Sequence, residues 1–167
     1  MQDLIRTFTK DTILMPTDNA WFDALYILKA KIPGDLEDDP FVFNITLLHI
    51  VPDVLIRTRE LTVGKALTGQ SLLGYEVQFL RTADDRVQVS VVGVEGSTAF
   101  VLMSDRSYTA KASNSIYHVI NRVLTPPREV MLTWLTSHVG ADVAAEMVSQ
   151  LSATAAGAPI ADVGNDK

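Results

Sequence analysis

The chain has 167 residues, a formal net charge of -6 at pH 7 and no cysteine. This length fits one domain with a sizeable core, but not two domains with independent cores. The lack of cysteine excludes disulfides, thiolate zinc ligands and cysteine nucleophiles. The acidic balance gives no electrostatic reason to approach nucleic acid or anionic lipid. We expect a soluble chain without direct membrane insertion and without a targeting segment, because it has neither a run of roughly 20 apolar residues nor the apolar core of a signal peptide.

The first predicted elements are a strand and a helix. Residues 12–16, TILMP, form a short β-type run that a proline stops. The next residues, 17–34, predict a helix that Thr17 or Asp18 caps at its start and that a Pro-Gly pair ends. The apolar face of this helix is expected at Trp21, Leu25 and Leu28.

The acidic stretch DLEDDP, residues 35–40, predicts a helix start rather than a calcium loop. It lacks the alternating oxygen ligands and the glycine of a calcium loop. Asp39 followed by Pro40 instead suits the cap and the first position of a helix. This helix is expected to continue to Pro52, with one apolar stripe at Phe43, Leu47 and Ile50 that Leu48 and Val51 widen.

The same predicted helix contains Asn44-Ile45-Thr46, which satisfies the acceptor pattern for N-glycosylation. The pattern requires only a reachable asparagine amide with a hydroxyl two residues later. Asn44 is therefore a candidate glycan site if the protein is secreted by a eukaryote.

From residue 61 the apolar period changes from helical to alternating, with glycines between short β runs. Strands are predicted at YEVQFL, RVQVSVV and AFVLM, and RTADDR supplies turn chemistry between the first two. Residues 116–124, IYHVINRVL, predict a last strand that is covered on both faces. One face would carry Ile116, Ile120 and Leu124, and the other Tyr117, Val119 and Val123.

Two helices are predicted after the proline pair, at residues 128–140 and 141–157. In the second helix an apolar residue recurs every fourth position, at Val143, Met147 and Leu151, and this stripe needs a partner. We expect a domain at residues 1–127, a helical extension at 128–156 and a linker or tail at 157–167.

Three segments resemble, in this order and spacing, the motifs of the fasciclin-like (FAS1) domain family. TILMPTDNAWFDAL is similar to its first motif, LLHIVPDVLIRTREL to its central tyrosine-histidine region, and NSIYHVINRVLTPP to its closing motif. The resemblance implies an α+β fold, a wedge-shaped β-sandwich covered by helices on one side, here with extra C-terminal helices.

The sequence also departs from the family pattern. The family normally has two helices before its first motif, whereas eleven residues precede Thr12, enough for about one short helix at QDLIRTF. The N-terminal helices are therefore expected to be truncated. The C-terminal helices could fill that groove, link to a further domain or dock on another protein. Leu48 stands where the family often has tyrosine, Ser115 replaces its glycine, and Asn121 replaces its aspartate.

The three histidines, His49, His118 and His138, fall in three different predicted elements. We interpret His118 as structural, because a buried polar ring needs hydrogen-bond partners that the backbone can supply. The alternative, in which His49 and His118 share a metal with Asp18, has no supporting ligand spacing. The motif residues expected to serve the structure are Thr17, Asp18, His118, Asn121 and Pro126.

The expected function is binding rather than catalysis, without a cofactor or metal. The sequence has no nucleophile elbow, phosphate-binding loop or HExxH motif. The resemblance implies adhesion, or binding of a protein or matrix component. It also implies an extracellular, secreted, cell-surface or lumenal protein, commonly with several such domains. The segment at residues 47–60 has more apolar surface than two helix faces need. It is a contact site if Val54, Leu55 or Ile56 is exposed, and the alternative is that all of these residues fill the core. Its expected partner-binding residues are Leu48, His49, Ile50, Val54, Leu55 and Ile56.

Two alternatives remain open. The first is a structural accessory subunit of a larger extracytoplasmic or thylakoid-lumen assembly, which the missing front helices and the 143-147-151 stripe suggest. The second is a hydrolase or small-ligand protein, which would need a cleft with converging polar groups near His118.

Overall fold

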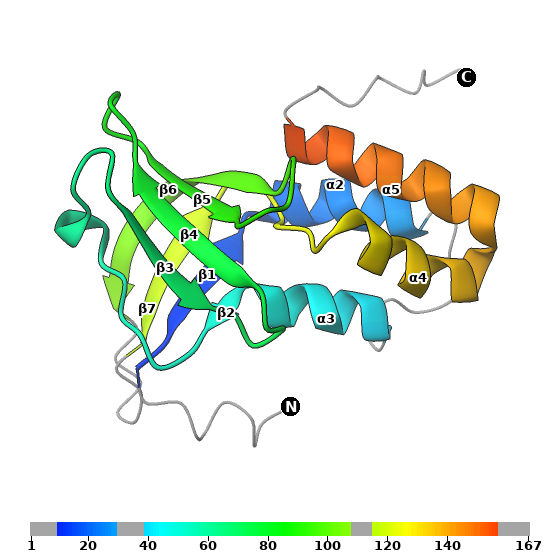
Figure 1. The fold of residues 1–167 in the computed structure, drawn as a ribbon, viewed down its shortest axis with the longest axis horizontal. Coiled ribbons are helices and arrows are strands. Elements are labelled where there is room, and N and C mark those ends of the chain that lie inside the picture. Colours follow the sequence, from blue (N-terminus) through cyan, green and yellow to red (C-terminus); the bar gives the residue numbers. More distant parts are fainter. Residues whose placement is uncertain (1–9, 30–38, 108–114, 157–167) are drawn as a thin grey trace.

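The computed structural model describes residues 10–29, 39–107 and 115–156 (Figure 1). Strands gather at one end of the molecule and helices at the other. The elements in chain order are β1 (Thr12–Pro16), α2 (Asp18–Lys29), α3 (Pro40–Leu48), β2 (Ile50–Val51), the 3-10 turn η2 (Thr58–Glu60), β3 (Ala66–Gln70), β4 (Glu76–Arg81), β5 (Val87–Val91), β6 (Thr98–Ser107), β7 (Ile116–Ile120), α4 (Arg128–Val139) and α5 (Ala141–Ala156).

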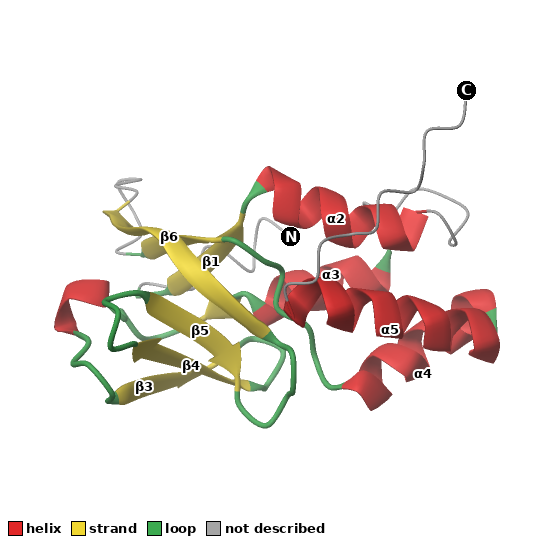
Figure 2. Ribbon diagram, turned by 90° about the horizontal axis from the view of Figure 1, so that it is seen from above, coloured by secondary structure: helices red, strands yellow, loops and turns green. Residues whose placement is uncertain are grey.

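The strands form one sheet in the order β2-β1-β7-β6-β5-β4-β3. β1 and β7 run parallel, and the other neighbours run antiparallel. β6 pairs with both halves of the sheet, and its register shifts on either side of Met103. Such irregularities bend a strand, and the two halves lie as separate layers in Figure 2. The predicted α+β wedge is confirmed.

The apolar interior is divided into two clusters. One lies within the sheet wedge and includes Leu14, Phe79, Val89 and Ile120. The other lies among the helices, where Met147 and Leu151 of α5 are buried in one cluster with Ala24 of α2. α5 therefore packs on this chain's own helices.

The helix boundaries follow from local chemistry. Thr17 caps α2, since its Oγ1 accepts a hydrogen bond from the backbone N–H of Ala20 at 3.2 Å. Asp39 caps α3 in the same way, accepting from Phe41 N at 2.7 Å, with Pro40 in the first turn. The predicted starts of both helices are confirmed. The short helix at QDLIRTF, the Pro-Gly end of α2, most of DLEDDP and the tail from residue 157 lie outside the described residues.

The prediction that α3 continues to Pro52 was wrong. The helix ends at Leu48, and Ile50 and Val51 form β2 instead. These two β-branched residues pair antiparallel with the edge of β1, where Ile50 lies opposite Ile13. β-branched side chains suit an extended strand, and here the open edge of β1 outweighs the apolar helical period.

The predicted apolar stripe of α3 was also wrong. The buried residues are Phe41, Ile45 and Leu48, whereas Phe43 is exposed. Apolar residues occur on every side of this helix, so sequence spacing alone does not determine which side faces the core.

The sheet differs from prediction in two places. β3 at ALTGQ was not predicted, because this edge strand is largely exposed and lacks a clear apolar alternation. β7 ends at Ile120 rather than at residue 124. Its buried face carries Ile116, His118 and Ile120, while Tyr117 and Val119 are only half-buried. Strands β1, β4, β5 and β6, the hairpin turn at RTADDR and helices α4 and α5 are confirmed.

Candidate functional site

The side chain of His49 joins two distant parts of the chain. The residue follows the last turn of α3 and is buried. Its Nδ1 lies 2.7 Å from the carbonyl oxygen of Ile45, and its Nε2 accepts a hydrogen bond from Leu124 N at 2.9 Å. Burial lowers the pKa of His49 to about 4, so the ring is neutral at neutral pH. Both ring nitrogens therefore form hydrogen bonds with backbone groups.

His118 makes a comparable connection on the inner face of β7. The side chain is fully buried, and its Nε2 lies 2.7 Å from the carbonyl oxygen of Ile56. Its ring packs on Phe79 in a T-shaped arrangement, with 6.1 Å between the ring centroids. His118 therefore ties β7 to the segment that follows β2.

The same segment is also held by Thr12. The hydroxyl of Thr12 donates to the carbonyl of Val54 at 2.8 Å and accepts from Ile56 N at 2.9 Å. Val54 points toward β3, since its Cγ1 would lie 3.2 Å from a Cβ added at Gly69. Residues 54–56 are thus fixed against β1, β3 and β7, and hydrogen bonds hold the Val54 carbonyl, the Ile56 N–H and the Ile56 carbonyl.

Three of the six predicted partner-binding residues are buried in this structure. Leu48, His49 and Ile56 each lie within the interior and cannot touch a partner in this conformation. The remaining three, Ile50, Val54 and Leu55, are half-buried. Of these, Ile50 reaches the outside of the sheet, because it pairs with Ile13 on β1.

Ile50 belongs to an apolar surface on the outside of β2, β1, β7 and β6. Strand register places Ile50 beside Ile13 and Ile13 beside Tyr117. A second row runs from Met15 to Val119 and from Val119 to Met103. Met15 is 47% exposed and Met103 is 49% exposed. We call these six residues, Ile13, Met15, Ile50, Met103, Tyr117 and Val119, the outer sheet face.

Met15 and Met103 were not predicted from the sequence to be surface residues. Alternation in TILMP was a usable signal, because Thr12 and Leu14 are buried whereas Ile13 and Met15 are not. It could not be used without knowing which face of the strand meets the core. Phe22 and Tyr26 of α2 form another exposed apolar pair, stacked with 6.0 Å between ring centroids.

The predicted structural residues have clear positions. Thr17 caps α2, and Asp18 lies exposed in its first turn. Asn121 Oδ1 accepts from Phe100 N at 2.7 Å and so connects the end of β7 to β6. Pro126 is buried just before α4. Asn44, the candidate glycan site, is half-buried on α3.

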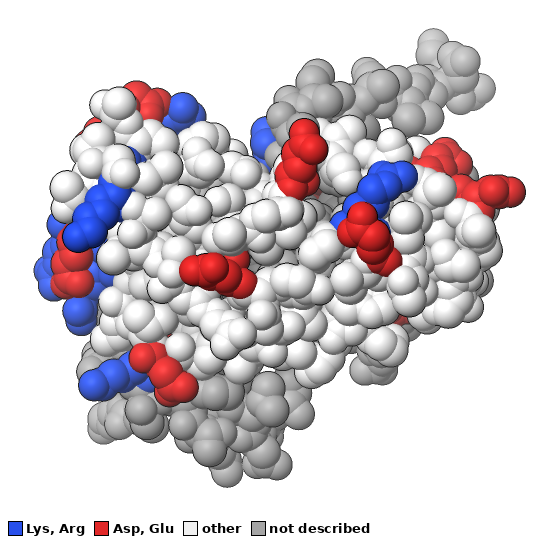
Figure 3. Space-filling model, viewed as in Figure 1, with Lys and Arg blue, Asp and Glu red and all other residues white. Residues whose placement is uncertain are grey.

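Charged side chains are dispersed on the face seen in Figure 3, where basic and acidic residues are mixed at the sheet end. Among the described residues, no group of three or more His, Asp or Glu side chains is arranged to hold a metal ion. No helix within the described ranges is long and apolar enough to cross a membrane.

The model of the fasciclin domain family matches residues 1–126, so the chain belongs to the fasciclin (FAS1) domain family. The family is known for adhesion and protein-binding roles. The chain is similar in fold to a FAS1 domain pair from the insect cell adhesion molecule fasciclin I, with 22% identity and a TM-score of 0.55. The similarity covers 74% of this chain and 39% of that one, so this chain spans well under two thirds of its neighbour. No curated protein matches the chain.

Proposed function

We propose that this chain is a non-catalytic FAS1-type adhesion or protein-binding module that acts outside the cytoplasm, on a cell surface, in a secreted protein or in an organelle lumen. Membership of the family supports binding to a protein or matrix component. The non-catalytic part is supported by His49 and His118, because both rings are buried and hydrogen-bonded to backbone groups. A general acid or base needs to reach a substrate.

The outer sheet face is the observation that best supports a binding surface. It places apolar residues side by side across four strands, and two of its members are about half exposed. Contiguous exposed apolar surface on a soluble domain often marks an interaction site. This proposal retains Ile50 from the predicted surface and moves the centre of the contact from residues 47–60 to β1 and β7.

The accessory-subunit alternative is not favoured by the C-terminal stripe. Met147 and Leu151 are buried, and Val143 packs against the same helical cluster within this chain. The stripe therefore leaves no apolar surface that another subunit would have to cover. Sedimentation of the purified chain separates the two proposals, since an obligate subunit would aggregate or associate whereas a module would remain monomeric.

The binding surface can be tested with one substitution and a matched control. Met15→Glu places a charge within the outer sheet face, at the β1 end of the row that runs through Val119 to Met103. Val63→Glu places the same charge at a similarly exposed apolar residue near β4. The immobilised wild-type chain and both variants would be exposed to the extracellular fraction of the source cells. We expect at least one protein to bind the wild type and Val63→Glu but not Met15→Glu.

Equal capture by all three chains would contradict the outer sheet face as the contact. Detection of the native full-length protein only in the cytoplasmic fraction would contradict the proposed compartment. Circular dichroism of both variants must show an unchanged fold for the comparison to count.

A further inference from the structure

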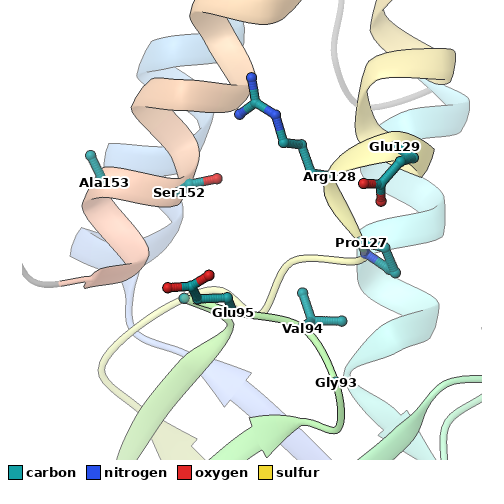
Figure 4. A pocket seen from close by; sticks show the side chains of 9 residues that line it. Gly93, Val94, Glu95, Pro127, Arg128, Glu129, Ser152 and Ala153 are labelled. Atoms are coloured by element: carbon teal, nitrogen blue, oxygen red, sulfur yellow. The ribbon is translucent and has the colours of Figure 1, made fainter.

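A cavity of about 570 Å³ lies where the β5–β6 loop meets the start of α4 and the end of α5. Figure 4 shows Arg128 and Glu129 on the α4 side, Ser152 on α5 and Glu95 on the loop. Val94, Pro127 and Ala153 add apolar surface to the lining. The cavity shares no residue with the outer sheet face.

The walls of this cavity are held in place by the fold. Ser97 Oγ accepts from Thr125 N at 2.9 Å and so ties the loop to the segment that leads into α4. A Cβ added at Gly96 would lie 3.6 Å from the carbonyl oxygen of Ser152, which shows how closely the loop approaches α5. Ser152 donates its hydroxyl hydrogen to Val148 O at 2.8 Å, so its oxygen can still accept. A site that is formed in advance loses less entropy on binding.

The charges around the cavity are not paired with one another. Glu95, Arg128 and Glu129 are all exposed. None of the three forms an ion pair or a side-chain hydrogen bond with the rest of the described chain. One guanidinium and two carboxylates are therefore available at one cavity. The complementary ligand carries one anionic and two cationic groups.

We propose that this cavity binds a free basic α-amino acid of the lysine or arginine type. The ligand carboxylate pairs with Arg128, whose guanidinium suits a bidentate contact with a carboxylate. The α-ammonium group and the side-chain cation pair with the carboxylates of Glu95 and Glu129. The aliphatic stem lies on Val94 and Pro127. The chain's net charge of -6 also favours a ligand with net positive charge.

The ligand class can be tested by titration of the ¹⁵N-labelled chain at low ionic strength. L-lysine should produce saturable shifts of the backbone amides at residues 93–96 and 128–129. Norleucine lacks the side-chain cation, and cadaverine lacks the carboxylate. We expect each to bind about threefold to tenfold more weakly than lysine, since exposed ion pairs contribute modestly. Equal binding of all three compounds, or no saturable shift with millimolar lysine or arginine, would overturn the proposal.

Charge-removing variants assign the contacts. Arg128→Gln should weaken lysine binding about threefold to tenfold but leave cadaverine binding unchanged, because only lysine carries the carboxylate. Glu95→Gln and Glu129→Gln should weaken both ligands. Glu76→Gln, at an exposed carboxylate on β4, is the matched control and should change neither. An equal effect of the control and the cavity variants would show nonspecific attraction and contradict the assigned site.

Discussion

The backbone N–H of Leu124 donates a hydrogen bond to Nε2 of His49, 75 residues earlier in the chain. The other ring nitrogen, Nδ1, meets the carbonyl of Ile45 within α3. Leu124 belongs to the sheet cluster, whereas Ile45 belongs to the helical cluster. The imidazole therefore connects the two apolar interiors of the domain through backbone groups.

This connection makes stability dependent on pH. The pKa of His49 is about 4 in the folded chain, lowered by burial from an unfolded value of 6.5. The unfolded chain therefore binds more protons than the folded chain between these two values, so stability falls as pH decreases from about 6.5 to 4. The stability lost through protonation of His49 approaches about 3 kcal/mol near pH 4. Urea denaturation across this pH range would measure the loss.

The variant His49→Gln provides the comparison for that experiment. It removes the titrating ring, so the pH dependence between 4 and 6.5 should become shallower even though the variant is less stable throughout. A variant that keeps the wild-type slope would assign the pH dependence to other groups.

The buried ring of His118 should be important for stability. His118→Ala removes the contact with Ile56 O and leaves a cavity beside Phe79. We expect a loss of about 2–4 kcal/mol in the free energy of unfolding. His138→Ala is the matched control, because His138 is exposed on α4, and it should cost less than about 0.5 kcal/mol. Equal effects in thermal or chemical denaturation would mean that burial of His118 is unimportant.

Asp11 is a buried carboxylate whose removal should stabilise the fold. Ser115 Oγ donates to its Oδ2 at 3.1 Å, but Oδ1 is buried without a hydrogen-bond partner among the described residues. Burial raises the pKa of Asp11 above its ordinary value. The folded chain therefore holds this proton at higher pH than the unfolded chain, and stability falls as pH rises above 3.8.

Asp11→Asn should increase the free energy of unfolding at pH 7 by about 1 kcal/mol, because it removes a buried charge. Asp84→Asn is an opposite control on the hairpin turn. Hydrogen bonds from Thr82 and Arg86 lower the pKa of Asp84, so its replacement should not stabilise. A destabilised Asp11→Asn chain at pH 7 would show that the hydrogen bonds to the carboxylate outweigh the cost of burying its charge.

Asn121 acts through its carbonyl oxygen. Since Oδ1 accepts from Phe100 N, Asn121→Asp keeps an acceptor at the same position and should leave stability nearly unchanged. Asn121→Ala leaves the Phe100 N–H unpaired and should cost about 1–2 kcal/mol. Denaturation of both variants decides the matter, and an equal loss in both would indicate that the amide nitrogen matters instead.

Much of the fold followed from local patterns. The caps at Thr17 and Asp39, the turn before Val87 and the alternating strands β4 and β5 each depend on neighbouring residues. Sequence spacing is sufficient for such features, because the interacting groups lie within a few positions of each other. The end of α3 was not predictable in this way. Ile50 and Val51 leave the helix to pair with β1, and that pairing partner lies more than thirty residues away.

The candidate binding surface was less predictable than the fold. An apolar excess at residues 47–60 was visible in the sequence, but Leu48 and Ile56 supply the core and only Ile50 lies on the outer sheet face. Met15 and Met103 lie in one row because each flanks Val119 on β7. Predicting such a row requires knowledge of the strand order, and no local signal in the sequence gives that order.

The sequence by itself determined the family, the order of most elements and the helix caps, because these depend on short motifs and on the period of apolar residues. Only the tertiary structure decided which apolar residues are interior, which remain exposed, and how the charges at the cavity lie unpaired. The physical reason is that burial is a property of strand register and layer packing between distant segments. An isoleucine such as Ile50 or Ile56 has the same local chemistry on either side of a sheet, and one step of register moves it from the core to the surface.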